Sequence, residues 1–175
     1  TTFTDVSNVI RGSGSAKTIT RNGNTQTSTA QSKYYGSSGA FDGAEMIGAA
    51  TGTPMLDHAD EFASAFQGVK WDLSQVFYCA ESVLLNTYRG SGIGHRFFDL
   101  REEHALALGC NKVAFCAVQR PVDHALRPAD YRPLNAFWEK RGYRPIPNAI
   151  AHFRWKDIDM ASETPKPLQF WARDL

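Results

Sequence analysis

The most regular pattern of hydrophobic and polar positions lies in the middle of the chain. A run of β-branched, aromatic and aliphatic residues at Val76–Leu85 is typical of a buried strand. After a glycine-rich turn, apolar residues recur at helical spacing from Ile93 to Leu108, and Gly109 follows where helices commonly end. Lys112–Val118 is a second, almost continuous apolar run. The pattern predicts two buried strands, and they should be parallel because a helix separates them.

The flanking segments carry weaker signals. Before this unit, Ala44–Thr51 predicts a strand. After it, a short helix is expected between Asp130, which can cap a helix, and Gly142, which can end one. The segments Ala149–Trp155 and Leu168–Ala172 predict two more strands, which the long polar connection between them would join as a closing hairpin.

Residues 1–40 differ from the rest because Ser, Thr, Gly and Asn crowd them and large apolar residues are few. Lys17–Thr29 is either a hairpin around Asn22–Gly23, a strong turn pair, or part of a tail. The sequence therefore predicts an atypical N-terminal segment over residues 1–40 and a folded α/β domain over residues 41–175.

The turn after the first buried strand, Arg89–Gly94, has three glycines in five positions, which lets a ligand approach the backbone. A strand, a glycine turn and a helix together present free amides and a helix N-terminus to an anion. A P-loop would need Lys and Ser or Thr after the last glycine, whereas His95–Arg96 follow. A dinucleotide fingerprint would need an acid after the next strand, where Gln119–Arg120 stand. The pattern that fits is Gln/Arg-x-x-Gly-x-Gly/Ala.

Two stretches of the chain resemble known motifs of one family. Leu84–Gly94, LLNTYRGSGIG, resembles motif A of the GNAT superfamily of acetyl-CoA-dependent N-acetyltransferases. Leu134–Tyr143, LNAFWEKRGY, resembles its motif B, where a helix ends in a Gly–aromatic pair. The resemblance extends from about Gly43 to the C-terminus. It implies a mixed, mostly antiparallel central sheet with a splayed parallel strand pair and flanking helices. It also implies acetyl-CoA as the cofactor, with its pantetheine arm between the splayed strands.

The resemblance further implies which residues meet the cofactor. The pyrophosphate would lie on the backbone amides of the glycine loop. The loop residues that the resemblance assigns to cofactor binding are Arg89, Gly90, Ser91, Gly92, Ile93 and Gly94. The oxyanion donor in this family is a backbone amide exposed by a strand bulge, which by position falls near Leu84 or Leu85. Arg89 either adds charge to this site or is a solvated arginine at the end of a strand.

Two side chains are candidates for acid–base chemistry. Glu81 interrupts an apolar strand, so it either faces water at a cleft or is held in the strand for a purpose. It is either a general base, whose pKa burial would raise, or one half of a structural ion pair. The family frequently has a tyrosine as general acid where this chain has Trp138, and an indole N–H cannot protonate a thiolate at neutral pH. Tyr131 is the candidate for that role here, whereas Tyr143 is expected in the core.

Composition limits the other possibilities. Lys and Arg number 19 against 18 Asp and Glu, so no excess of charge attracts nucleic acid or an acidic membrane. No apolar run approaches the ~20 residues of a transmembrane helix, and the chain does not start like a signal peptide. We expect Cys79, Cys110 and Cys116 to be reduced thiols in a cytoplasmic protein. The histidines show no metal-ligand spacing, so we expect no metal.

These observations lead to one functional hypothesis and two alternatives. The sequence predicts an enzyme that transfers acetyl from acetyl-CoA directly to a primary amine of a small molecule or peptide. The first alternative is a non-catalytic acyl-CoA-binding or regulatory module on the same fold, and the second is a nucleotide-binding domain. A homodimer is compatible with the exposed strands of the predicted hairpin.

Overall fold

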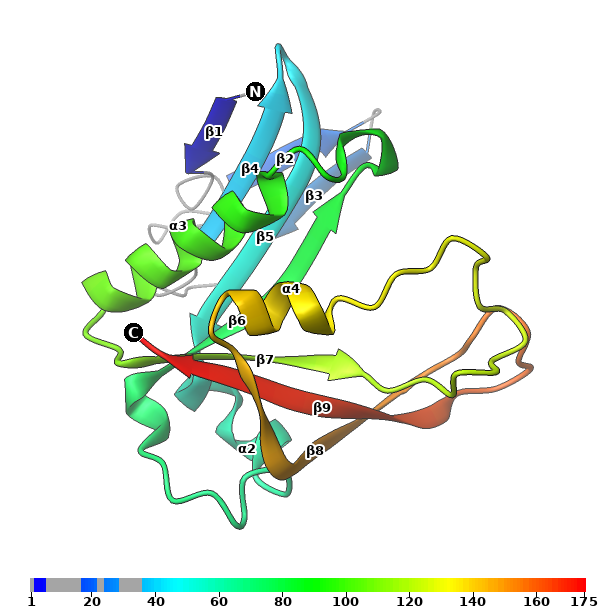
Figure 1. Ribbon diagram of the computed structural model, residues 1–175. Coiled ribbons are helices and arrows are strands. Elements are labelled where there is room, and N and C mark those ends of the chain that lie inside the picture. The colour runs from blue at the N-terminus through cyan, green and yellow to red at the C-terminus, as the bar shows by residue number, and fades with distance from the viewer. Residues whose placement is uncertain (1, 6–16, 22–23, 29–35) are drawn as a thin grey trace.

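A computed structural model describes residues 2–5, 17–21, 24–28 and 36–175 (Figure 1). Within these residues the main sheet has seven strands in the order β1-β4-β5-β6-β7-β9-β8. In chain order they are β1 (Thr2–Asp5), β4 (Gly36–Asp42), β5 (Glu45–Pro54), β6 (Val76–Leu84), β7 (Lys112–Val118), β8 (Arg144–Trp155) and β9 (Thr164–Asp174). Among these described strands, β6 and β7 pair in parallel and the other neighbours pair antiparallel. The predicted fold class is confirmed.

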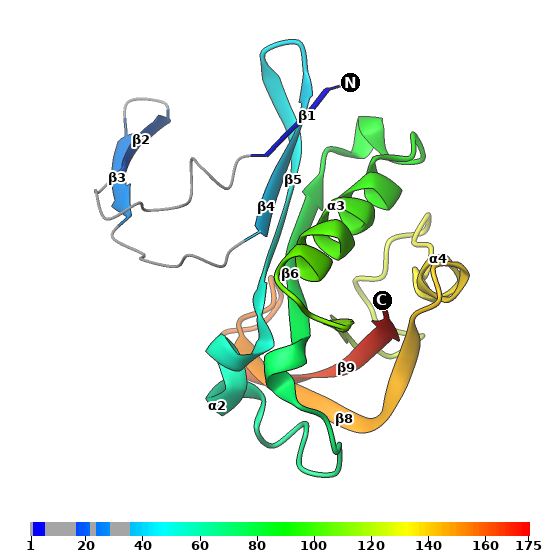
Figure 2. The ribbon, with the colours of Figure 1, turned by 90° about the vertical axis from the view of Figure 1, so that its left-hand side faces the viewer.

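The helices lie on both faces of this sheet. Helix α3 (Ile93–Ala107) and helix α4 (Asn135–Lys140) lie on one face, and α2 (Ala59–Phe62) lies on the other (Figure 2). The 3-10 turns η1 (Met55–His58), η2 (Leu73–Gln75) and η3 (Asn86–Tyr88) complete the connections.

The core has a separate cluster on each face of the sheet. Phe77 belongs to the cluster beneath α3 and α4, and its neighbour Tyr78 belongs to the cluster beneath α2. Consecutive strand residues point to opposite faces, so these two clusters lie on opposite sides of the sheet. A third cluster joins Ile93 and Phe97 of α3 to β4 and β5. Helix α3 therefore packs against β4, β5, β6 and β7 on one face of the sheet.

The parallel strands separate soon after they meet. Their described pairing runs from Val76↔Lys112 to Tyr78↔Ala114. Beyond Tyr78, β6 continues beside β5 alone, and β7 continues beside β9. The splayed pair that the resemblance implied is present, and it opens a gap on the C-terminal side of Tyr78.

A β-bulge interrupts β6 just where this gap opens. The pairing of β5 with β6 passes from Gly52↔Cys79 to Ala50↔Ser82, so β6 holds one residue more than β5 over this interval. Cys79 packs under α3 before the bulge, and the Ser82 hydroxyl is bonded to α3 after it. The extra residue therefore moves Glu81 to the opposite face, the face of Tyr78. Simple alternation from Cys79 would have placed Glu81 under α3.

The N-terminal strands fit the predictions in part. Strands β2 (Lys17–Arg21) and β3 (Asn24–Ser28) pair antiparallel as a separate two-stranded sheet, as the hairpin alternative predicted. The expected turn residues, 22 and 23, lie outside the described residues. Strand β4 of the main sheet spans residue 40, and the division of the chain near that residue stays a prediction.

The start of the motif B helix was predicted wrongly. Helix α4 begins at Asn135, with Leu134 as its N-cap, and Asp130 caps nothing in it. Pro133 explains the difference, because a proline disfavours helical backbone in the residue before it. The segment 119–134 is irregular, as expected.

Candidate active site

The glycine loop between β6 and α3 has the backbone conformation that glycine permits. Gly90 and Gly92 have φ angles of 79° and 87°. A Cβ atom built on either would meet no atom within 4 Å, so open space lies beside the loop. The Ser91 hydroxyl donates a hydrogen bond to the Tyr88 carbonyl at 2.6 Å and closes the turn. The glycines are thus required by the backbone conformation and keep its surface accessible.

The N-terminus of α3 presents amides to this open space. Among the described residues, Arg96 has the first amide of α3 with a backbone acceptor, the Gly92 carbonyl at 3.2 Å. The amides that precede it are the donors that every helix leaves unpaired at its start. Together with the helix dipole they form a site suited to a phosphate group. The residues present therefore fit an anionic cofactor.

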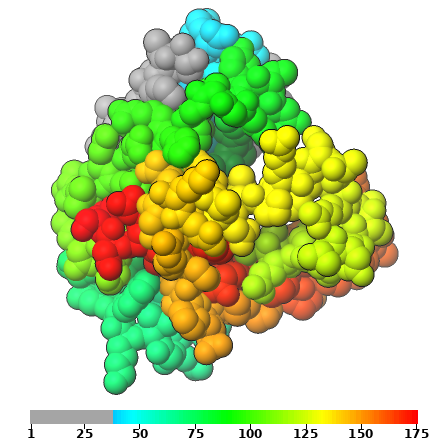
Figure 3. All heavy atoms as spheres, in the orientation of Figure 1, coloured from blue at the N-terminus to red at the C-terminus, as the bar shows by residue number. Residues whose placement is uncertain are grey.

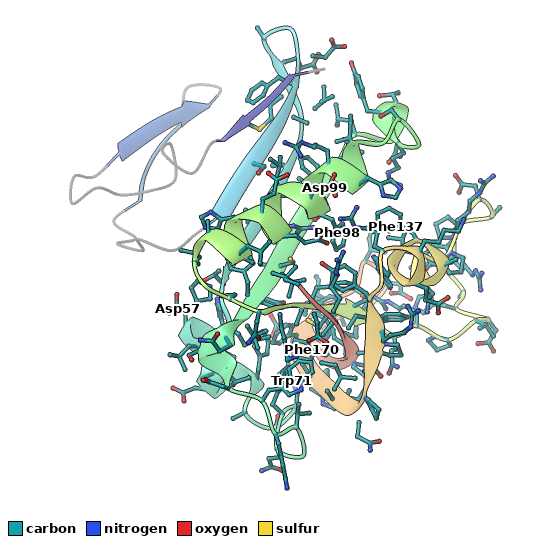
Figure 4. All side chains as sticks on the ribbon, turned by 60° about the vertical axis from the view of Figure 1, so that its left-hand side comes forward. Asp57, Trp71, Phe98, Asp99, Phe137 and Phe170 are labelled. Atoms are coloured by element: carbon teal, nitrogen blue, oxygen red, sulfur yellow. The ribbon has the colours of Figure 1, made fainter. Side chains whose placement is uncertain are left out.

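Helix α4 is fixed beside this loop by α3. The rings of His95 and Phe137 meet edge-on with their centres 4.7 Å apart. Phe98 and Phe137 also meet edge-on, with their centres 5.7 Å apart, between the two helices (Figure 4). The Arg141 guanidinium donates to Asp99 at 2.7 Å and to Glu102 at 2.9 Å. This ion cluster holds the end of α4 against α3.

Two hydrogen bonds show how the amides of β6 are directed beyond the bulge. The Glu81 amide donates to the Thr51 hydroxyl at 3.2 Å, and the Leu85 amide donates to the Ile47 carbonyl at 2.9 Å. Both partners lie on the side of β5. Amides alternate along a strand, so those of Ser82 and Leu84 are directed to the other edge, where the gap opens. Of the two amides expected as oxyanion donors, the one of Leu85 is already engaged.

Comparison with known proteins agrees with this geometry. The sequence model of the Acetyltransferase (GNAT) family matches residues 21–143. The chain belongs to the GNAT family. Acetyl-CoA is the cosubstrate of that family. A search of curated proteins found no match.

Solved GNAT structures show the same fold. One is an IAA acetyltransferase from Bacillus cereus ATCC 14579, with 13% identity, 82% of this chain and 79% of that chain covered, and a TM-score of 0.51. A second is an aminoglycoside 6'-N-acetyltransferase complexed with coenzyme A, with 14% identity, coverage of 81% and 73%, and a TM-score of 0.51. A third is a GNAT family acetyltransferase from Elizabethkingia anophelis with acetyl-CoA bound, with 12% identity, coverage of 81% and 77%, and a TM-score of 0.51.

Glu81 is exposed in this GNAT domain, so of the two positions that the sequence left open, it faces water and is not buried. The physical reason is the separation of β6 from β7, which leaves β6 exposed from Ala80 to Val83, and the bulge sets the face to which the Glu81 side chain points. The Glu81 backbone is anchored on both sides. Its amide donates to Thr51, and its carbonyl oxygen lies 3.4 Å from Arg101 Nη1. The carboxylate is therefore accessible on the face of Tyr78.

Tyr78 and Cys116 form a pair that the sequence did not indicate. Tyr78 Oη and Cys116 Sγ share a hydrogen bond at 3.3 Å. Burial raises the pKa of Tyr78 far above its usual value, and Cys116 and the Glu81 carboxylate add to the increase. Burial also raises the pKa of Cys116, the hydrogen bond with Tyr78 opposes this increase, and the Glu81 charge adds to it. Both groups are neutral at pH 7, and both sense the charge of Glu81.

A cavity of about 850 Å³ lies on the opposite face, beside α4. Figure 3 shows the molecule hollowed between the loop that starts α3, in green, and the segment that leads to α4, in yellow. The splayed end of β7, the segment before α4 and strand β9 line the cavity, and so do Tyr131 and Trp138. Tyr131 is 54% exposed, and the Arg127 guanidinium lies 5.1 Å from its ring centre. Tyr131 and Glu81 are thus on different faces.

The segment before α4 is anchored to the β8–β9 connection. Arg120 donates two hydrogen bonds to the Asp157 carboxylate, at 2.9 and 2.7 Å. Lys166 Nζ lies 3.0 Å from the same carboxylate, and Trp155 Nε1 donates to it at 3.0 Å. The Arg120 hydrogen bonds, followed by that of Lys166, hold the pKa of Asp157 well below its usual value. One wall of the cavity is thereby fixed.

Other predicted features have clear positions. Tyr143 is fully buried, as expected, and its hydroxyl donates to Glu102 at 2.9 Å. Cys79, Cys110 and Cys116 are free thiols. The described ranges contain no group of three His, Cys, Asp or Glu residues that could hold a metal ion. None of the helices in those ranges combines the length and apolar character needed to cross a bilayer.

Proposed function

We propose that this protein transfers the acetyl group of acetyl-CoA to a primary amine of a small molecule or peptide. The observation that carries the proposal is the position of the glycine loop, whose free amides lie beside the splayed parallel strands. An anion on the loop and an extended chain in the gap would belong to one ligand. Acetyl-CoA has both parts, a pyrophosphate and a long pantetheine arm.

The cofactor would be held mainly by the backbone. Its pyrophosphate would lie on the loop amides, with Arg89 exposed at the entrance to the loop. The cofactor-binding residues of this loop are Arg89, Gly90, Ser91, Gly92, Ile93 and Gly94. The arm would follow the cavity beside α4 toward the gap, where the Leu84 amide is directed. Acetyl-CoA supplies a thioester, which is attacked at its acyl carbon and releases a thiolate.

Glu81 is the proposed general base. An aliphatic amine has a pKa near ~10.4 and must lose a proton before it can attack. The exposed carboxylate on the far face of the gap can take that proton directly or through a water molecule. The Leu84 amide would stabilise the oxyanion, and such a donor contributes ~3 kcal/mol. Tyr131, which lines the cavity, is the acid that the sequence suggested for the leaving sulfur.

The alternative is a GNAT-fold module that binds acyl-CoA without turnover. Trp138 favours this alternative, because it occupies the position of the usual tyrosine and cannot donate a proton to a thiolate. The exposure of Tyr131 in an irregular segment also favours it. Cofactor binding is common to both functions, and release of the coenzyme A thiol separates them.

The first test is thermal unfolding with acetyl-CoA, and with NAD and ATP as controls. A ligand at 100 times its Kd adds ~2.7 kcal/mol to the free energy of unfolding. We expect acetyl-CoA to raise the melting temperature and NAD and ATP to leave it unchanged. Thiol release is then measured over a panel of primary amines. Binding without turnover would favour the module, and a shift with NAD or ATP instead would contradict acyl-CoA binding.

A further inference from the structure

The Tyr78 hydroxyl lies where the parallel strands part. Tyr78 is the last residue of β6 that pairs with β7, and its partner is Ala114. Cys116 is two residues farther along β7, so its side chain lies on the same face as Ala114. The hydrogen bond between Tyr78 Oη and Cys116 Sγ, at 3.3 Å, therefore reaches from one strand to the other at the start of the gap.

The ring of Tyr78 is held firmly in this position. It is 8% exposed and meets the Phe62 ring edge-on at 4.9 Å. Phe170 lies 6.2 Å away and His58 lies 5.9 Å away, measured between ring centres. A hydroxyl on such a fixed ring keeps its position relative to a group that enters the gap, which is what proton transfer requires.

The bulge places Glu81 on this same face. Its carboxylate is accessible, and its charge acts on both Tyr78 and Cys116. The Glu81 carboxylate, which can take a proton, and the Tyr78 hydroxyl, which can give one, therefore lie on the same face beside the gap. The amides directed into the gap, those of Ser82 and Leu84, lie on the next residues of the same strand.

We propose that Tyr78 is the proton donor to the leaving sulfur of coenzyme A, and that Cys116 positions its hydroxyl. This inference rests on the proposed function and names a second catalytic residue for it. Tyr78 replaces Tyr131 as the proton donor. Tyr131 is exposed beside Arg127 in the irregular segment, and it lies on the other face of the sheet from Glu81.

The proton transfers balance. Before attack, the exposed Glu81 carboxylate takes the ammonium proton and passes it to solvent, so the acceptor is a neutral amine. The acceptor nitrogen then forms a bond with the acyl carbon, the C–S bond breaks, and its electron pair leaves on sulfur. The Glu81 carboxylate takes one proton from nitrogen, and the Tyr78 hydroxyl gives one proton to sulfur. The products are an amide and a thiol. Return of the proton from Glu81 to the Tyr78 oxygen, directly or through water, restores both groups.

The first test measures binding and needs no acceptor. Calorimetry at alkaline pH, where part of the thiol is ionised, compares coenzyme A with desulfo-coenzyme A, which lacks the sulfur. A hydrogen bond from Tyr78 to the sulfur predicts about tenfold tighter binding of coenzyme A by the wild type. Tyr78→Phe should bind both ligands equally. Tyr143→Phe, which removes the hydroxyl of another buried tyrosine, bonded to Glu102, should keep the tenfold preference.

The second test measures thiol release with the best amine of the panel at saturating substrates. We expect Tyr78→Phe to lower kcat about a hundredfold with little change in either KM. Cys116→Ser, which keeps a hydrogen-bonding partner for Tyr78, should retain more of the activity and of the sulfur preference than Cys116→Val. Melting temperatures of all variants show whether they are folded.

The outcomes separate the two proposals. The wild type is expected to prefer coenzyme A over desulfo-coenzyme A and to release thiol with an amine. If Tyr78→Phe does both equally well, the role of Tyr78 is overturned and the proposed function stands. The role of Tyr78 would also be overturned if Tyr131→Phe, and not Tyr78→Phe, lost the preference for coenzyme A and the release of thiol. If the wild type binds no coenzyme A, or binds it and releases no thiol, the proposed function fails and the role of Tyr78 fails with it.

Discussion

Arg101 Nη1 and the Ser82 hydroxyl oxygen lie 3.0 Å apart, in a hydrogen bond that joins the middle of α3 to β6 just past its bulge. The same nitrogen lies 3.4 Å from the carbonyl oxygens of Glu81 and Thr51. Arg101 is only 3% exposed, and its guanidinium lies over the Phe98 ring at 4.7 Å. One buried side chain of α3 thus holds both strands at the point where Glu81 changes face.

Arg101→Ala should destabilise the protein by roughly 2–4 kcal/mol, because it leaves a cavity and removes several partly buried hydrogen bonds. Urea denaturation measures the loss. Arg96→Ala is the matched control, since Arg96 lies on the exposed side of the same helix in a surface pair with Glu103 at 3.1 Å. Its effect should stay below about 1 kcal/mol. Equal losses in the two variants would contradict a structural role for Arg101 at the bulge.

Gly92→Val should abolish the rise in melting temperature that acetyl-CoA produces, because a side chain would cover the amides at the start of α3. Gly109 is a close control at the other end of the same helix. It has a φ of 81°, against 87° for Gly92, and neither has an atom within 4 Å of an added Cβ. Both variants carry similar backbone strain, of order 1–3 kcal/mol. Loss of the ligand effect in Gly109→Val as well would show that strain, and not contact with the cofactor, is responsible.

Glu81→Gln should lower kcat by about 10²–10⁴ and leave the affinity for acetyl-CoA unchanged, because an amide cannot accept the proton of the amine. Steady-state kinetics and calorimetry measure the two quantities. Glu103→Gln, which removes an exposed carboxylate of α3, is expected to be silent in both. A Glu81→Gln variant with wild-type kcat would remove Glu81 from the mechanism.

Asp157→Asn should lower the melting temperature at pH 7. The pKa of Asp157 is depressed in the folded protein, chiefly by Arg120, so its ionised form stabilises the fold above the unfolded-state pKa of about 3.9. That contribution shrinks as the pH falls below ~4 toward the folded-state pKa. The melting temperatures of the two proteins should therefore converge in acid. Asp174→Asn, at an exposed pair with Lys112, should show little difference throughout. A gap that persists at low pH would mean that packing, not charge, is lost.

The elements that the sequence predicted are those set by local signals. The apolar runs located β6 and β7, and the glycines located the loop, because Gly90 and Gly92 meet a backbone requirement at their own positions. The end of α3 followed from Gly109 in the same way. Local chemistry was sufficient for the phosphate side of the site.

The face of Glu81 could not be predicted, because it depends on the register between β5 and β6. One extra residue in β6 reverses the alternation, and nothing in the sequence of β6 alone marks it. Tyr78 escaped notice for the same reason, since its role follows from where pairing with β7 stops and from Cys116 on the neighbouring strand. The later start of α4 is different, because Pro133 carried a signal against helix that could have been used.

The separation of β6 from β7 also creates a weakly paired boundary, or seam, within the main sheet. The sheet consists of two halves, one ending at β6 and the other beginning at β7, and their described backbone pairing runs only from Val76↔Lys112 to Tyr78↔Ala114. Away from this pairing, α3 and its contacts with α4 bridge the two halves on one face, and the cluster of Phe62, Tyr78 and Phe170 bridges them on the other. Amide hydrogen exchange should therefore be faster along the two facing edges of the gap than where β6 and β7 pair. A ligand that occupies the gap would act as the missing strand and would couple the two halves into one cooperative unit.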